Sequence, residues 1–106
     1  MSGYRKFYYV YIITNKYRTV YYVGVTNSIS RRINEHEKEL VKGFSTRYRC
    51  KFLIFYEKFR DINQAIRREK EIKKWSRLKK SELILKQNPE MRSLNRTIHF
   101  TGEDYL

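Results

Sequence analysis

The segment DINQAIRREKEIKKW (residues 61–75) has the pattern of an amphipathic helix. At 3.6 residues per turn, its apolar residues share one stripe, which consists of Ile62, Ala65, Ile66 and Ile72. Glu69 falls inside that stripe, whereas Glu71 falls among the lysines on the opposite side. A buried carboxylate is costly unless it is paired, protonated or bound to a metal. Glu69 is therefore a candidate metal ligand, or else one half of a structural ion pair with a buried arginine.

The charge of the chain predicts a polyanionic partner. Its 24 Lys and Arg exceed its 11 Asp and Glu, so the net charge is +13. Residues 67–80 alone contain eight Lys or Arg against two Glu. Nucleic acid is the commonest partner of so basic a protein, although ribosomal proteins and membrane-surface binders share this charge. A buried acid behind a basic face suits metal-assisted chemistry on a phosphate.

The size and composition predict one domain in a reducing compartment. A chain of 106 residues can bury one modest core, and its ten Tyr and six Phe must supply much of that core. The lone Cys50 excludes an intramolecular disulfide. Residues 7–13 are too short and too rich in tyrosine for a signal sequence or a membrane span. We therefore expect a cytoplasmic protein with no membrane association.

The order of elements predicts an α+β fold, a three-stranded antiparallel sheet flanked by about three helices. Residues 7–13 and 20–25 read as a β-hairpin, and residues 52–59 read as the third strand. Helices are expected at residues 29–40, 61–75 and 78–87. Gly43 can end the first of them in a left-handed conformation, and residues 88–89 (Asn-Pro) stop the last. Residues 1–95 would form the domain, and residues 96–106 a tail that is disordered or lies along a sheet edge.

The hairpin and the first helix contain further candidates. Tyr22 and Gly24 project to one face of the second strand, and a glycine within a strand often marks a close approach. Arg32 and His36 lie one helical turn apart, on the shoulder of the apolar stripe. The alternative is that Arg32 pairs with a glutamate of its own helix, that His36 is an ordinary boundary histidine, and that the tyrosines only pack.

The ordered set of short motifs resembles the GIY-YIG nuclease superfamily. The motifs of the hairpin and first helix are Tyr9-Val10-Tyr11, Tyr22-Val23-Gly24, Thr26-Asn27, Arg31-Arg32 and Glu35-His36. Those at residues 68–70 (Arg-Glu-Lys) and 74–77 (Lys-Trp-Ser-Arg) resemble its small, single-domain bacterial branch, the UPF0213-like proteins. The resemblance covers roughly residues 7–94. Tyr9 stands where the family has its name-giving glycine, which carries no catalytic group, so this departure concerns packing more than chemistry.

The resemblance implies a DNA endonuclease that depends on one divalent ion, Mg²⁺ or Mn²⁺. The implied catalytic site consists of Tyr11, Tyr22, Arg32, His36, Glu69 and Asn88. In this site Tyr22 matches the general base, and Glu69 matches the metal ligand. A phenol is a poor base at neutral pH, so a nearby cation such as Arg32 must favour the phenolate. Arg32 would also bind the scissile phosphate through its planar guanidinium.

DNA is the partner that the charge and the resemblance together predict. The residues expected to contact it are Gly24, Arg47, Arg68, Lys73, Lys74, Arg77, Lys79 and Lys80. Two other hypotheses stay open, namely a non-catalytic nucleic-acid-binding module on the same fold and a basic RNA- or ribosome-associated protein. The first predicts that substitution of Glu69 or Tyr22 leaves function unchanged, and the second requires a preference for RNA in competition binding. A partner protein and the oligomeric state are open as well.

Overall fold

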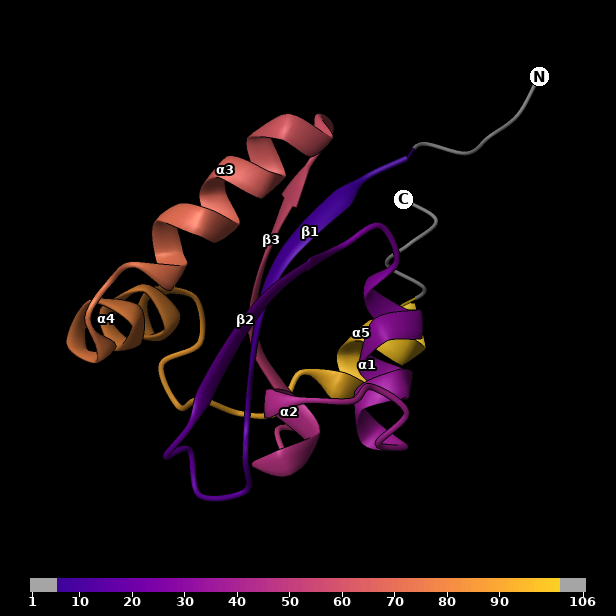
Figure 1. Cartoon of the computed structure of the whole chain (residues 1–106), viewed down its shortest axis with the longest axis vertical. Helices are drawn as coiled ribbons and strands as arrows, with labels where there is room; N and C mark the ends of the chain where they lie inside the picture. Colours follow the sequence, from indigo (N-terminus) through magenta and orange to yellow (C-terminus); the bar gives the residue numbers. More distant parts are fainter. Residues whose placement is uncertain (1–5, 102–106) are drawn as a thin grey trace.

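The structure, a computed structural model, describes residues 6–101, apart from the side chains of the last two. It confirms an α+β fold with a three-stranded antiparallel sheet, and within the described residues this sheet is flanked by five helices (Figure 1). The strands are β1 (Tyr8–Thr14), β2 (Tyr21–Thr26) and β3 (Phe52–Phe59). The helices are α1 (Ile29–Glu37), α2 (Phe44–Arg47), α3 (Ile62–Lys73), α4 (Arg77–Gln87) and α5 (Asn95–Thr101).

The strand β1 lies in the middle of the sheet, in the order β2-β1-β3. Helices α3 and α4 cover one face of the sheet, and α1 and α5 cover the other (Figure 1). Successive side chains of a strand point to opposite faces, so β1 contributes to two separate cores. The core under α1 and α5 contains Tyr9, Tyr11, Ile13, Ile29, Ile33 and Ile98. The core under α3 and α4 contains Val10, Ile12, Ala65, Ile72 and Ile84.

Helix α3 forms where residues 61–75 predicted it. Its N-cap is Asp61, whose side chain accepts a hydrogen bond from the backbone N–H of Asn63 at 2.8 Å. Ala65 and Ile72 are fully buried beneath it, whereas Ile62 at its start is 45% exposed. The predicted stripe therefore covers the sheet along most of the helix, but its first turn extends past the sheet.

Helix α1 is shorter than the sequence predicted. It ends at Glu37, and the chain leaves it through Glu39, which has a left-handed φ of 57°. Leu40, which the prediction placed on the apolar stripe, is 66% exposed. Gly43 does adopt a positive φ, but it precedes the short helix α2 instead of ending α1. A two-turn helix already covers its share of the sheet with Ile29 and Ile33, so packing does not favour a longer one.

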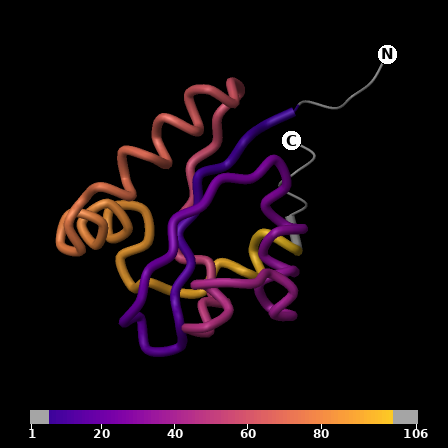
Figure 2. Tube along the Cα trace, viewed as in Figure 1, coloured from indigo at the N-terminus to yellow at the C-terminus, as the bar shows by residue number. Residues whose placement is uncertain are grey.

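The C-terminal part of the described chain crosses from one face of the sheet to the other. After α4, which ends before Asn88 as predicted, the trace passes the end of the sheet and reaches the side of α1 (Figure 2). Met91 packs on the α3 and α4 side, and Leu94 packs on the α1 side. Helix α5 then begins at Asn95 and buries Ile98 completely. The ordered fold thus continues past residue 95, where we expected a tail, while residues 102–106 lie outside the described residues.

Candidate active site

Tyr11 lies at the centre of the α1 face of the sheet. It is 2% exposed and pairs with Gly24 on the neighbouring strand β2. A β-carbon built on Gly24 would lie only 2.5 Å from the phenol oxygen of Tyr11. The close approach that Gly24 predicted is therefore real, but the group that approaches is the ring of Tyr11. This packing explains why position 24 holds a glycine, without any contact between Gly24 and nucleic acid.

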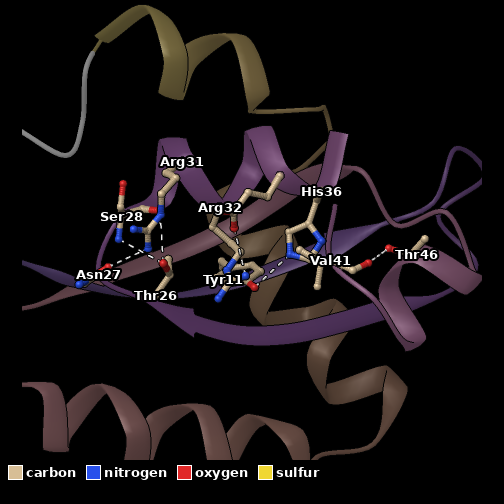
Figure 3. Close-up of polar contacts among 10 residues, drawn as sticks. Tyr11, Thr26, Asn27, Ser28, Arg31, Arg32, His36, Val41 and Thr46 are labelled. Atoms are coloured by element: carbon tan, nitrogen blue, oxygen red, sulfur yellow. Dashed lines mark hydrogen bonds and ion pairs between the residues drawn. The ribbon is translucent and has the colours of Figure 1, made fainter. Parts of the chain in front are cut away.

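His36 and Tyr22 complete an aromatic cluster around Tyr11. The hydroxyl of Tyr11 lies 3.2 Å from Nε2 of His36, and this hydrogen bond spans the space between β1 and α1 (Figure 3). The ring of Tyr22 is centred 5.9 Å from that of His36 and 6.4 Å from that of Tyr11. His36 is 2% exposed, so it is a buried histidine and no ordinary boundary residue.

Burial holds both partners of this hydrogen bond in their neutral forms. It lowers the pKa of His36 to about 4, and the nearby positive charge of Arg32 lowers it further, while Glu35 opposes the shift. Burial also raises the pKa of Tyr11, and so do the phenol of Tyr22 and the carboxylates of Glu35 and Glu69, while Arg32 opposes this. At neutral pH the pair is therefore a phenol and a neutral imidazole.

Arg32 lies beside Tyr11 with part of its guanidinium available. Its Nη1 donates a hydrogen bond to Oε1 of Glu35 at 3.1 Å, as the alternative interpretation anticipated. A guanidinium has five N–H donors, so one carboxylate does not exhaust it. Its Nε is buried and has no hydrogen-bond partner within the described residues. Arg32 and His36 point toward Tyr11 from α1 (Figure 3).

Glu69 supplies a carboxylate from α3, the helix on the other face of the sheet from α1. Its side chain is 13% exposed and forms an ion pair with Nζ of Lys73 at 2.6 Å. The partner of Glu69 is therefore an exposed lysine and not a buried arginine. Its negative charge is near enough to raise the pKa of Tyr11. Within residues 6–101, no group of three or more His, Cys, Asp or Glu residues could enclose a metal ion. A single carboxylate does fit Mg²⁺ that keeps several waters and takes oxygens from a phosphate.

The hydrogen bonds of Asn88 that the structure describes go to backbone groups and to none of these side chains. It caps α4, and its Nδ2 donates to the backbone oxygens of Ile54 at 3.0 Å and Arg92 at 2.8 Å. Its Oδ1 accepts from the backbone N–H of Arg92 at 3.2 Å. Both ends of the amide thus hold the turn after α4 against β3, and β1 separates β3 from Tyr22 and Gly24 on β2.

The predicted nucleic-acid contacts divide into two groups. Arg68 forms a bidentate pair with Glu57 at 2.9 and 3.0 Å, and Arg77 donates to the backbone oxygens of Arg18 and Thr19, both at 2.8 Å. These cations, and Lys73 beside Glu69, have partners in the fold. The remaining predicted contacts are the exposed Arg47, Lys74 and Lys79, and the partly exposed Lys80.

A shallow groove on the outer side of α3 contains Arg67 and Lys70, two cations that were not among the predicted contacts, beside Lys74, which was. Arg67, Lys70 and Lys74 line it together with Trp75. All three cations are exposed, and no ion pair within the described part of the chain engages them. The spacing of these cations, three and four residues apart, would have placed them on one helix face, and this is the signal that could have identified them.

Phe44 is a second omission beside the site. Its ring lies nearly parallel to that of Tyr22, with centroids 6.3 Å apart and an interplanar angle of 23°. Tyr48, one turn later, follows at 4.6 Å from Phe44. Only Arg47 of this segment was among the predicted contacts, and the spacing of the two aromatic residues, four apart, is the signal that could have identified them.

Comparisons with known proteins identify the family of the chain. A family model of the GIY-YIG catalytic domain matches residues 7–82. The UPF0213 protein of Syntrophus aciditrophicus is 37% identical over 83 residues, which are 77% of this chain and 93% of that protein. A UPF0213 protein of Staphylococcus haemolyticus is 34% identical over 76 residues, covering 72% of this chain and 92% of its own.

A solved structure has the same fold. The NMR structure of a UPF0213 protein from Bacillus halodurans aligns with a TM-score of 0.52 and 27% identity, covering 85% of this chain and 95% of that one. The fold and the family-model match define a GIY-YIG domain, the catalytic domain of a family of nucleases. The chain belongs to the GIY-YIG family, as a small UPF0213-like member. In residues 6–101 there is no helix of the length and hydropathy that crossing a membrane requires.

Proposed function

We propose that this protein is a metal-dependent endonuclease that hydrolyses phosphodiester bonds in DNA. The observation that carries the proposal is the cluster of a phenol pair, an imidazole and a guanidinium on the α1 face, with a carboxylate of α3 whose charge acts on Tyr11. They are Tyr11 on β1, Tyr22 on β2, Arg32 and His36 on α1, and Glu69 on α3. A scaffold that only binds nucleic acid has no need to place these groups together around a buried hydrogen bond.

In the proposed reaction, Tyr22 acts on the attacking water. Its phenolate accepts a proton from the water as the water oxygen bonds to phosphorus, the bond to the leaving oxygen breaks, and that oxygen takes a proton from solvent. Arg32 binds a phosphoryl oxygen through the donors that Glu35 does not use. Tyr11 and His36 are both neutral, so their hydrogen bond positions the site.

Glu69 is the residue that would hold the ion. A bound Mg²⁺ or Mn²⁺ supplies neutralisation of charge on the phosphate and the leaving oxygen. The carboxylate is largely buried and near Tyr11, and its present partner is the half-exposed Lys73, which can move away from it without leaving a buried cation. One carboxylate supports one ion and does not support a two-metal site.

The exposed cations of the α3 groove supply the proposed contacts to the DNA backbone. The logarithm of the DNA-binding constant falls linearly with the logarithm of the salt concentration. Each lysine or arginine that neutralises a phosphate makes the slope of this line steeper by about one unit. We expect Lys74→Ala to reduce the measured slope by about one. Lys86→Ala removes an exposed lysine that lies beside Glu82 on α4, and it should leave the slope unchanged.

The experiment that tests the proposal compares two glutamates of α3. Labelled plasmid, single-stranded, flap and branched DNA are incubated with the protein and Mg²⁺, Mn²⁺ or a chelator. Glu69→Gln should lower the cleavage rate by about 10²-fold or more. Glu71→Gln is the matched control, since Glu71 is 54% exposed and pairs with Arg68 on the outer side of the helix.

Metal-dependent cleavage that Glu69→Gln abolishes and Glu71→Gln retains supports the enzyme. If the wild type and both variants bind DNA equally and none of them cuts any substrate with either metal, the proposal is wrong. The non-catalytic binding module on the same fold is then the better account. Circular dichroism on each variant confirms that the comparison is made between folded proteins.

A further inference from the structure

A line of aromatic rings leads from the candidate active site to the surface. It begins at the buried Tyr11, passes through Tyr22 and Phe44, and ends at Tyr48 on the far side of α2. Phe44 is 49% exposed and Tyr48 is 43% exposed, so the last two rings present about half of their surface to solvent. Large aromatic side chains exposed side by side mark a binding surface more often than isolated apolar residues do.

Packing alone does not account for these two residues. Helix α2 has only four residues, and Ser45 is the one that is buried. Phe44 contacts the ring of Tyr22 and the ring of Tyr48, yet about half of its own surface stays exposed to solvent. The platform made by Phe44 and Tyr48 is thus attached to the proposed general base and open on its outer side.

The charge around the platform identifies the kind of ligand. Lys42, Arg47 and Arg49 are exposed residues of the same short segment. The guanidinium of Arg47 lies 5.8 Å from the centre of the Tyr48 ring. Aromatic rings with cations beside them are the combination by which proteins bind single-stranded nucleic acid, since bases stack on the rings and phosphates meet the cations.

We infer that Phe44 and Tyr48 form a stacking platform for an unpaired base of the DNA strand whose phosphate lies in the active site. Bases within a duplex are already stacked on one another and do not expose a face to the platform. The inference rests on the proposed function and names its substrate class, DNA that is single-stranded at the point of cleavage. Arg47 would contact the phosphate next to the stacked base.

The test measures binding without cleavage, in a chelator, so that it does not depend on catalysis. Anisotropy of a labelled oligonucleotide gives the dissociation constant for a single strand and for a blunt duplex of the same length and salt concentration. Phe44→Ala should weaken binding of the single strand about tenfold and leave binding of the duplex within twofold of the wild type. Phe44→Tyr keeps the ring and should bind as the wild type, whereas Phe44→Leu keeps the apolar volume and should behave as Phe44→Ala.

Two further variants and a fluorescence measurement test whether the effect is specific to the platform. Tyr48→Ala removes the outer ring of the platform, which contacts Phe44 and not Tyr22 in the line of rings. It should also weaken binding of the single strand by several-fold. Leu78→Ala removes a side chain that is 70% exposed on α4, and it should change neither constant. Fluorescence of 2-aminopurine within the single strand should be quenched on binding to the wild type and less quenched with Phe44→Ala.

The inference is overturned if Phe44→Ala weakens single strand and duplex equally, or if it changes neither. A wild type that cleaves DNA while Phe44→Ala binds a single strand normally would leave the proposed function standing and refute the platform. If the wild type cuts nothing, but Phe44→Ala lowers the affinity for the single strand and the quenching, the proposed enzyme is refuted and the platform stands.

Discussion

The two faces of the sheet are built from the same three strands but have opposite chemical character. Under α3 and α4 the buried residues of the hydrophobic core are aliphatic apart from Phe55. Under α1 and α5 the core includes Tyr9 and Tyr11, and His36 is buried against Tyr11. On strand β1 the division falls between neighbouring residues, since Tyr11 belongs to one face and Ile12 to the other.

The difference indicates how a small domain separates stability from chemistry. Buried aliphatic side chains stabilise the fold by removing apolar area from water, and they carry no polar groups that need hydrogen-bond partners. The α1 face accepts buried polar atoms, and two of them, Nδ1 of His36 and Nε of Arg32, have no hydrogen-bond partner in the described part of the chain. Unsatisfied groups of this kind cost stability, which is the usual compromise of a functional site.

The largest expected effect is on the cleavage rate of Gly24→Ala. The added β-carbon would meet the phenol of Tyr11, so Tyr11 must move, and a displacement of about 1 Å in a catalytic site can cost 10²-fold in rate. Overpacking should also lower the free energy of unfolding by about 1–3 kcal/mol.

Val23→Ala is the matched change on the other face. Val23 is 4% exposed beneath α3 and α4, and losing two methyl-sized groups should cost about 2 kcal/mol of stability. The folded protein should nevertheless cleave at the wild-type rate. Urea denaturation and cleavage kinetics on both variants check the comparison, and equal activity of the two would show that the faces are not functionally distinct.

The next effect is a dependence of stability on pH that comes from His36. Its pKa is about 4 in the folded protein and about 6.5 when unfolded, so the unfolded chain binds more protons between these values. Stability should therefore fall as the pH drops from about 7 to about 4, by an amount on the order of 3 kcal/mol. Above pH 7 this contribution is constant.

His36→Gln should remove this part of the pH dependence. The measurement is the free energy of unfolding by urea at pH 7 and pH 5 for the wild type and the variant. The wild type should lose more stability than the variant over that interval. An identical loss in both proteins would mean that His36 is not held neutral by burial.

The smallest effect is expected from Arg68→Met, on the α3 side. Arg68 bridges Glu57 on β3 and Glu71 on α3, and its side chain is 26% exposed. Ion pairs near the surface contribute up to about 1 kcal/mol, and methionine keeps the apolar part of the side chain. We expect a loss of stability of that size that shrinks in 1 M NaCl, with cleavage unchanged. A loss of cleavage without a loss of stability would indicate that Arg68 contacts the substrate.

Much of the fold followed from periodicity in the sequence. The alternation in the two strands placed Tyr22 and Gly24 on one face, and the helical pattern of residues 61–75 singled out Glu69, which is largely buried as expected. The helical pattern of residues 29–40 placed Arg32 and His36 one turn apart, and the resemblance to the GIY-YIG superfamily added Tyr11. These are local patterns, which a sequence displays directly.

The features that the sequence did not reveal depend on distant contacts. Helix α5 has too few turns for a visible stripe, and it is held because Ile98 packs between α1 and the sheet. The buried state of His36 depends on Tyr11, which is 25 residues away. Gly24 was assigned to nucleic acid because the sequence could not tell which group approaches it, and Asn88 is held by backbone groups of β3 and the following turn.

The adjacent residues Tyr21 and Tyr22 allow the most direct measurement of the central claim. Tyr21 lies on the α3 and α4 side, where its hydroxyl is 2.8 Å from that of Ser81, and Tyr22 lies in the aromatic cluster on the α1 side. Tyr22→Phe should lower the cleavage rate by about 10²-fold or more with little change in melting temperature. Tyr21→Phe should cost about 1 kcal/mol of stability and leave the rate unchanged. Cleavage by Tyr22→Phe at the wild-type rate would contradict the account.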